Sequence, residues 1–112
     1  WSDTPLGGPG VNAAVARGPG GWPIRPGDAI TVDLVGGHEG YLADATRTWF
    51  RDEPNALLAE ALAVCEAILA ELETMMRPGV PAVEPKLVFP GVGAVGVENT
   101  YAVDRDGPLR LT

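Results

Sequence analysis

Residues 29–50 contain two segments of strand character separated by a short turn rich in glycine. In the first segment Ile30, Val32 and Leu34 alternate with polar residues, which is the period of a half-buried strand. Residues 41–50 supply a returning segment, and the glycines between the two give the turn its backbone freedom. The pattern predicts a β-hairpin, and this hairpin limits the possible folds more than any other feature of the chain.

Asp33 and Asp44 lie on opposite arms of this predicted hairpin. If the chain reverses at His38 and Glu39, the two aspartates become direct cross-strand neighbours on one face. Like charges placed opposite each other destabilise a sheet, and partial burial increases the cost. A bound cation is the simplest way to offset the repulsion, so the pair is the first candidate for a functional site.

The hydrophobic period changes after the hairpin. Apolar residues then recur at spacings of three and four, as in an amphipathic helix: Leu58, Leu62, Cys65, Leu69, Leu72 and Met76. Pro54 stands near the expected start of this helix, and Arg77-Pro78-Gly79 ends the pattern. We therefore expect a helix over residues 54–76, and we interpret Cys65 as a small core residue.

A second hairpin is expected around Gly91, which separates two short apolar segments. Glu84 precedes this hairpin and Glu98 stands near its far end, so a reversal at Gly91 brings the two close in space. Two hairpins that each carry a carboxylate pair can hold a hard divalent cation with oxygen ligands alone. The alternative is a solvated acidic surface, which is the commoner state of such residues. The predicted fold class is α+β, with antiparallel hairpins in one sheet and one long helix packed on that sheet.

Charge and composition argue against several other classes of protein. Fifteen acidic and eight basic residues give a net charge of −7, which argues against a nucleic-acid partner. No apolar run approaches the roughly 20 residues of a membrane span, so we expect no membrane partner. The 112 residues are enough for one domain at most. Cys65 is the only cysteine, so no internal disulfide can form, and we expect a reducing, cytoplasmic setting.

The acidic residues also stand in a specific sequence context. Pro26-Gly27-Asp28, Val32-Asp33-Leu34 and residues 44–49 resemble the metal-binding core of the pita-bread metallopeptidases, peptidase family M24. Residues 84–91 and 93–100 resemble the last two ligand segments of that family. The resemblance is closest to the Xaa-Pro aminopeptidase and prolidase branch, and it covers nearly the whole chain.

This resemblance implies a partial pita-bread (creatinase/aminopeptidase) fold and a metal-dependent peptidase that hydrolyses the N-terminal Xaa-Pro bond through water activated by two metal ions. It also implies four metal ligands: Asp33, Asp44, Glu84 and Glu98. Asp44 and Glu98 take the bridging positions, and Glu84 is expected to accept the proton of the attacking water. Mn²⁺ is the first expectation for both ions, with Co²⁺, Zn²⁺ and Fe²⁺ as alternatives. The expected substrate is a peptide with proline at its second position.

Two features depart from the family pattern. Relatives carry a histidine ligand and a second, substrate-facing histidine between the helix and the first glutamate segment, but here Arg77 runs almost directly into Glu84. We therefore expect a truncated chain, 1–112, with an internal segment missing and a join near residues 80–84. Arg17 stands where relatives often have a histidine. An arginine there can contact a substrate carboxylate or carbonyl, but it cannot shuttle a proton.

These departures leave a second hypothesis open, namely a catalytically inactive pita-bread module that binds a peptide or a partner protein. The missing segment would also leave a sheet edge uncovered, which favours pairing with another chain, for example in a homodimer. His38, the only histidine, is interpreted as a polar residue at the hairpin tip and not as a metal ligand. Arg47 is expected to have a structural hydrogen-bonding role.

Overall fold

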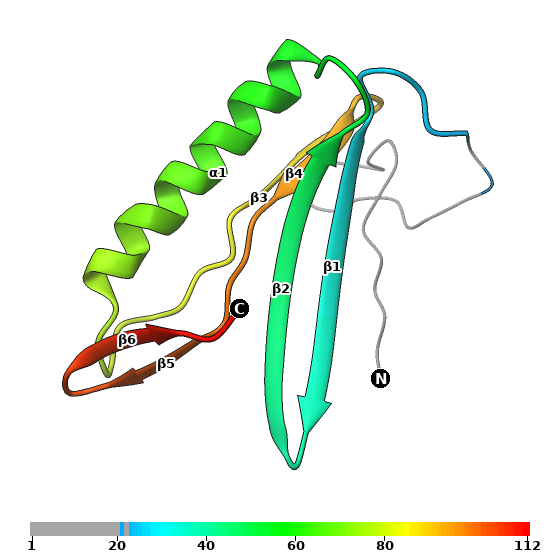
Figure 1. Ribbon diagram of the computed structural model, residues 1–112. Coiled ribbons are helices and arrows are strands. Elements are labelled where there is room, and N and C mark those ends of the chain that lie inside the picture. Colours follow the sequence, from blue (N-terminus) through cyan, green and yellow to red (C-terminus); the bar gives the residue numbers. More distant parts are fainter. Residues whose placement is uncertain (1–20, 22) are drawn as a thin grey trace.

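The computed structural model describes residues 21 and 23–112, and Figure 1 shows how they are arranged. The elements follow in the order β1 (Ala29–His38), β2 (Tyr41–Phe50), α1 (Ala56–Met75), β3 (Lys86–Phe89), β4 (Gly93–Gly96), β5 (Tyr101–Asp104) and β6 (Gly107–Arg110). The strands pair as antiparallel hairpins, β1 with β2, β3 with β4, and β5 with β6. The predicted α+β class, with antiparallel hairpins and one long helix, is confirmed for the described residues.

The hairpins do not merge into one sheet, so the expectation of a single sheet of two hairpins is wrong. Each hairpin is a two-stranded sheet of its own, and β5–β6 is a third hairpin beyond the two expected. The β3–β4 hairpin lies between α1 and the β1–β2 hairpin (Figure 1). An isolated bridge between Thr46 and Glu98 joins β2 to the segment that follows β4.

The turn between β1 and β2 differs from the one that the sequence symmetry predicted. Glu39 and Gly40 are its central residues, with φ angles of 49° and 87°, and a type I′ turn requires a positive φ at both positions. The resulting register pairs Asp33 with Thr46, so the prediction that Asp33 and Asp44 are direct cross-strand neighbours is wrong. The register differs by two residues from the predicted one. Because side chains alternate with a period of two, both aspartates stay on the same face.

The helix α1 begins after Asn55, whose side chain accepts a hydrogen bond from the Leu57 amide and so caps the first turn. It ends at Met75, close to the predicted span of 54–76. Its buried face packs against β4, where Leu58, Ala61 and Cys65 of the helix and Val95 of the strand form the core. Cys65 is fully buried, which confirms its interpretation as a core residue.

Residues 76–85 connect α1 to β3 without helix or strand. The join predicted near residues 80–84 falls in this connection and stays a prediction. Among the described residues, no helix is both long and apolar enough to cross a membrane.

Candidate metal centre

A row of three residues runs from β1 across β2 to the segment after β4. Asp33 lies opposite Thr46 in the register of the first hairpin, and Thr46 exchanges two backbone hydrogen bonds with Glu98, of 3.2 and 3.0 Å. The Thr46 side chain is fully buried, and its hydroxyl donates to the Glu98 carboxylate at 2.9 Å. Asp44 precedes Thr46 by two residues and therefore shares its face of the strand. This arrangement brings the carboxylates of Asp33 and Asp44, from the β1–β2 hairpin, close to that of Glu98, which follows the β3–β4 hairpin.

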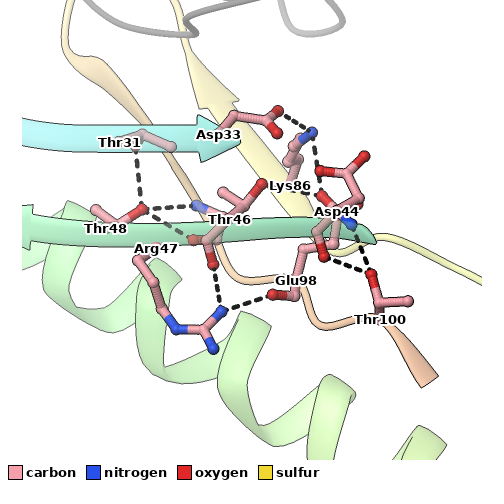
Figure 2. A network of polar contacts seen from close by, with 10 residues as sticks. Thr31, Asp33, Asp44, Thr46, Arg47, Thr48, Lys86, Glu98 and Thr100 are labelled. Atoms are coloured by element: carbon pink, nitrogen blue, oxygen red, sulfur yellow. Dashed lines mark hydrogen bonds and ion pairs between the residues drawn. The ribbon is translucent and has the colours of Figure 1, made fainter. Parts of the chain in front are cut away.

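The carboxylates of Asp33, Asp44 and Glu98 each offer an oxygen atom within 4.8 Å of the other two. Figure 2 shows the three side chains together with Lys86. Glu98 is buried, and the Oδ1 atom of Asp44 is buried without a hydrogen-bond partner among the described residues. Burial, together with the charges of Glu98 and Asp33, raises the pKa of Asp44. Three converging carboxylates, one of which has a buried oxygen that lacks a hydrogen-bond partner among the described residues, suit a hard divalent cation.

Threonine hydroxyls join β2 to the chain between residues 96 and 100, which carries Glu98. The Thr100 hydroxyl accepts a hydrogen bond from the Asp44 amide at 2.6 Å and donates to the Asp44 carbonyl at 2.7 Å. Further along β2, the Thr48 hydroxyl accepts from the Gly96 amide at 3.1 Å and donates to the Gly96 carbonyl at 2.9 Å. These two contacts flank the backbone bridge described above. Side-chain hydroxyls thus replace the backbone partners that a continuous sheet would supply.

Arg47 lies next to Thr46 and supports the bridge through its guanidinium group. Its Nη1 atom donates to the backbone carbonyls of Thr46 and Glu98, at 2.8 and 2.6 Å. Its Nη2 atom donates to Asn99 Oδ1 at 2.6 Å. The structural hydrogen-bonding role predicted for Arg47 is confirmed, because all these contacts hold the chain around Glu98 in position.

Lys86, which the sequence reasoning did not single out, lies among the carboxylates. Its Nζ atom is 3.0 Å from Asp33 Oδ2 and 3.5 Å from Glu98 Oε2. Burial alone would lower the pKa of Lys86, but its hydrogen bond to Asp33 and the charges of Asp33, Glu98 and Glu84 raise the pKa overall. One signal was available in the sequence, since Lys86 is the only lysine and follows Glu84 by two residues.

The other residues singled out from the sequence lie elsewhere. Glu84 is exposed and does not belong to the group of three converging carboxylates. Arg17 falls outside the described residues. The His38 side chain is 92% exposed at the hairpin tip, and its Nε2 atom is 4.0 Å from Glu39 Oε1. This confirms the interpretation of His38 as a polar residue of the turn. Of the four predicted ligands, the structure brings Asp33, Asp44 and Glu98 together and leaves Glu84 apart from them.

A pocket with a volume of about 270 Å³ opens beside the carboxylates. Its polar side includes Asp44, Glu84 and Glu98. Its apolar side comes from α1 and from the connection to β3, with Leu69, Leu72, Met76, Val80 and Val83. A concave, mainly apolar surface with a few convergent polar groups is typical of a small-ligand site. Glu84 therefore faces the same pocket as two members of the carboxylate group.

The model of metallopeptidase family M24 matches residues 4–84, which is well over half of the 112 residues. The matched part includes the β1–β2 hairpin, α1, Asp33, Asp44 and Glu84, and it ends before Lys86 and Glu98. No curated protein and no solved structure matches the chain.

Proposed function

Because the chain belongs to metallopeptidase family M24, we propose that it acts as a metal-dependent peptidase on the bond between an N-terminal residue and a following proline. The observation that carries the proposal is the convergence of Asp33, Asp44 and Glu98 within 4.8 Å. An all-oxygen ligand set favours Mn²⁺, with Co²⁺, Zn²⁺ and Fe²⁺ as alternatives. We also propose that the hairpins and α1 are part of a pita-bread domain.

In this proposal all four carboxylates are metal ligands, and Glu84 is in addition the proton acceptor. Asp33, Asp44 and Glu98, joined by Glu84 from the pocket side, would hold two divalent ions. When bound, such a pair of ions lowers the pKa of a water molecule and polarises a substrate carbonyl. The carboxylate of Glu84 accepts the proton of the attacking water, and its exposure on the pocket side leaves it free to do so.

The proposed substrate is a peptide with proline at the second position, bound in the pocket beside the carboxylates. The apolar side of the pocket, including Leu69 and Leu72, excludes water from one side of the bound peptide. Arg17 is proposed to contact a carboxylate or carbonyl of the substrate. Because the only histidine of the chain is at the hairpin tip, we assign proton transfer at this site to the Glu84 carboxylate, and we expect slow turnover.

The experiment that tests this function is an assay for release of the N-terminal residue from an Xaa-Pro peptide in the presence of Mn²⁺. We expect slow release by the wild type and none by Asp44→Asn. Glu39→Gln is the matched control, because it removes one carboxylate charge at the hairpin tip, and it should behave as the wild type. Release that persists with a chelator or in Asp44→Asn would contradict the proposal.

A second candidate function is a non-catalytic module that binds a peptide or partner protein in the same pocket. Lys86 favours it, since its ammonium group pairs with Asp33 and Glu98 and offsets part of the negative charge that would attract a metal ion. Two results would support this candidate over the first. The purified protein would contain no Mn, Co, Zn or Fe and gain no thermal stability when these are added, and it would bind an Xaa-Pro peptide without cleaving it.

A further inference from the structure

We propose that Lys86 is a tethered counter-cation: its ammonium group takes the place of a metal ion between Asp33 and Glu98, and it must leave them before a divalent cation binds. The inference rests on the metal site of the proposed function but does not require peptidase activity. It makes Lys86 a residue that determines how tightly the site holds metal.

The contacts of Lys86 show why the two cations exclude each other. Its Nζ atom is 3.0 Å from Asp33 Oδ2 and 3.5 Å from Glu98 Oε2, and both residues belong to the group of converging carboxylates. A divalent ion bound by the same carboxylates would stand next to the ammonium group, where like charges repel strongly in a partly buried site. Occupation by Lys86 and occupation by a metal ion are therefore alternatives.

The surroundings of Lys86 favour the ion-paired position. The side chains of Lys86, Asp33 and Glu98 are 29%, 11% and 8% exposed, so the contacts are screened less than those of a surface pair. Lys86 lies opposite Gly96 in the β3–β4 register, and a Cβ atom at position 96 would come within 2.8 Å of Lys86 Cγ. The glycine leaves the space through which the lysine stem reaches the carboxylates.

One ammonium group does not neutralise all the acidic residues of the site. Lys86 pairs with Asp33 and Glu98, whereas the Oδ1 atom of Asp44 stays buried without a partner among the described residues. Three carboxylates and one ammonium group leave a net negative charge, and this charge attracts a divalent cation. The lysine therefore competes with metal binding but does not abolish it.

Calorimetric titration with Mn²⁺ tests the competition on the wild type, Lys86→Met and Arg105→Met. The last variant is a matched control, because it removes the same charge from an exposed turn. We expect Lys86→Met to bind Mn²⁺ at least tenfold more tightly than the wild type and Arg105→Met to match the wild type. Equal affinity of wild type and Lys86→Met would overturn the role of Lys86 while leaving the metal site intact. An absence of Mn²⁺ binding by both would overturn the metal site as well.

A second measurement needs no substitution, because Lys86 is the only lysine of the chain. Reductive methylation followed by mass spectrometry gives the modification rate of Lys86, with the N-terminal amine as an internal reference. We expect saturating Mn²⁺ to raise the ratio of the two rates several-fold, since the metal displaces the ammonium group into solvent. An unchanged ratio at saturating Mn²⁺ would overturn the proposal. Should Lys86→Met fail to fold, this ratio decides the question.

Discussion

Lys86 and Gly96 lie directly opposite each other in the β3–β4 hairpin, and the missing side chain of the glycine gives the lysine stem its path. In Gly96→Ala the new Cβ atom would stand 2.8 Å from Lys86 Cγ. We expect a loss of about 1–3 kcal/mol in the free energy of unfolding from overpacking, measured by urea denaturation.

Two further variants separate this contact from the general effect of replacing a strand glycine. Gly36→Ala is the control, because a Cβ atom there meets nothing within 4 Å, and it should leave the free energy of unfolding nearly unchanged. In a Lys86→Ala background, which has no Cγ atom, Gly96→Ala should cost clearly less. A cost that is the same in both backgrounds would show that the lysine stem is not the obstacle.

Thr48→Val tests whether hydroxyl groups hold the hairpins together. The substitution leaves the buried amide and carbonyl of Gly96 without the hydroxyl that pairs with both. We expect a loss of about 1–3 kcal/mol in the free energy of unfolding, the cost of an unsatisfied buried polar group. Thr48→Ser keeps the hydroxyl and should lose much less. If Thr48→Ser were as unstable as Thr48→Val, methyl packing and not hydrogen bonding would be the cause.

Asp44→Asn should change stability in opposite directions without and with metal. Without metal, the variant loses a carboxylate that stands beside Glu98 and Asp33, so we expect it to be more stable than the wild type by roughly 0.2–1 kcal/mol. With Mn²⁺ the wild type gains stability through binding and the variant does not. Thermal denaturation with and without Mn²⁺ checks both signs. A variant that is less stable in both conditions would contradict the repulsion argument.

Tyr101 should make stability depend on pH in the alkaline range. Its phenol donates a hydrogen bond to Glu73 and accepts one from Asn99 at 3.0 Å. Burial, followed by the hydrogen bond to Glu73, raises the pKa of Tyr101. The pKa of Tyr101 in the folded state exceeds the unfolded value of about 10. The contribution of Tyr101 to the free energy of unfolding is therefore complete below about pH 10, and it is lost as pH rises through the folded pKa.

Urea denaturation across this range is the measurement. The free energy of unfolding of the wild type should fall more steeply with rising pH than that of Tyr101→Phe. Tyr41→Phe serves as the control, because Tyr41 is 82% exposed at the hairpin tip, and it should follow the wild type. If the free energy of unfolding fell equally steeply with pH in the wild type and in Tyr101→Phe, Tyr101 would not be the cause of the alkaline loss of stability.

The first hairpin and the helix were predictable because their patterns are local. Alternation along residues 29–50 and the stripe of apolar residues on α1 follow directly from the periods of strand and helix. The turn was placed wrongly because the symmetry of the sequence says nothing about φ. The positive φ angles of Glu39 and Gly40 decide the register, and the preference of Gly40 for that conformation was a stronger signal than the spacing of the aspartates.

The site was predictable only in part. Asp33, Asp44 and Glu98 could be named because their context resembles a family pattern, whereas their grouping depends on contacts between distant segments. The hydrogen bond from Lys86 to Asp33 spans 53 residues and the one from Thr48 to Gly96 spans 48. No periodicity encodes such contacts. They follow from how the β3–β4 hairpin docks on β2, which is a property of the tertiary structure.

The bridge between Thr46 and Glu98 also bears on the order in which the chain folds. Each hairpin can form from neighbouring residues, but Thr46 and Glu98 lie 52 residues apart, and closing so long a loop carries a larger entropic cost than closing a hairpin turn. We therefore expect the carboxylates of Asp33 and Asp44 to meet that of Glu98 after the local hairpins have formed. Repulsion among the three carboxylates should then act mainly when the β3–β4 hairpin docks on β2. Lys86, which belongs to that hairpin, reduces the repulsion.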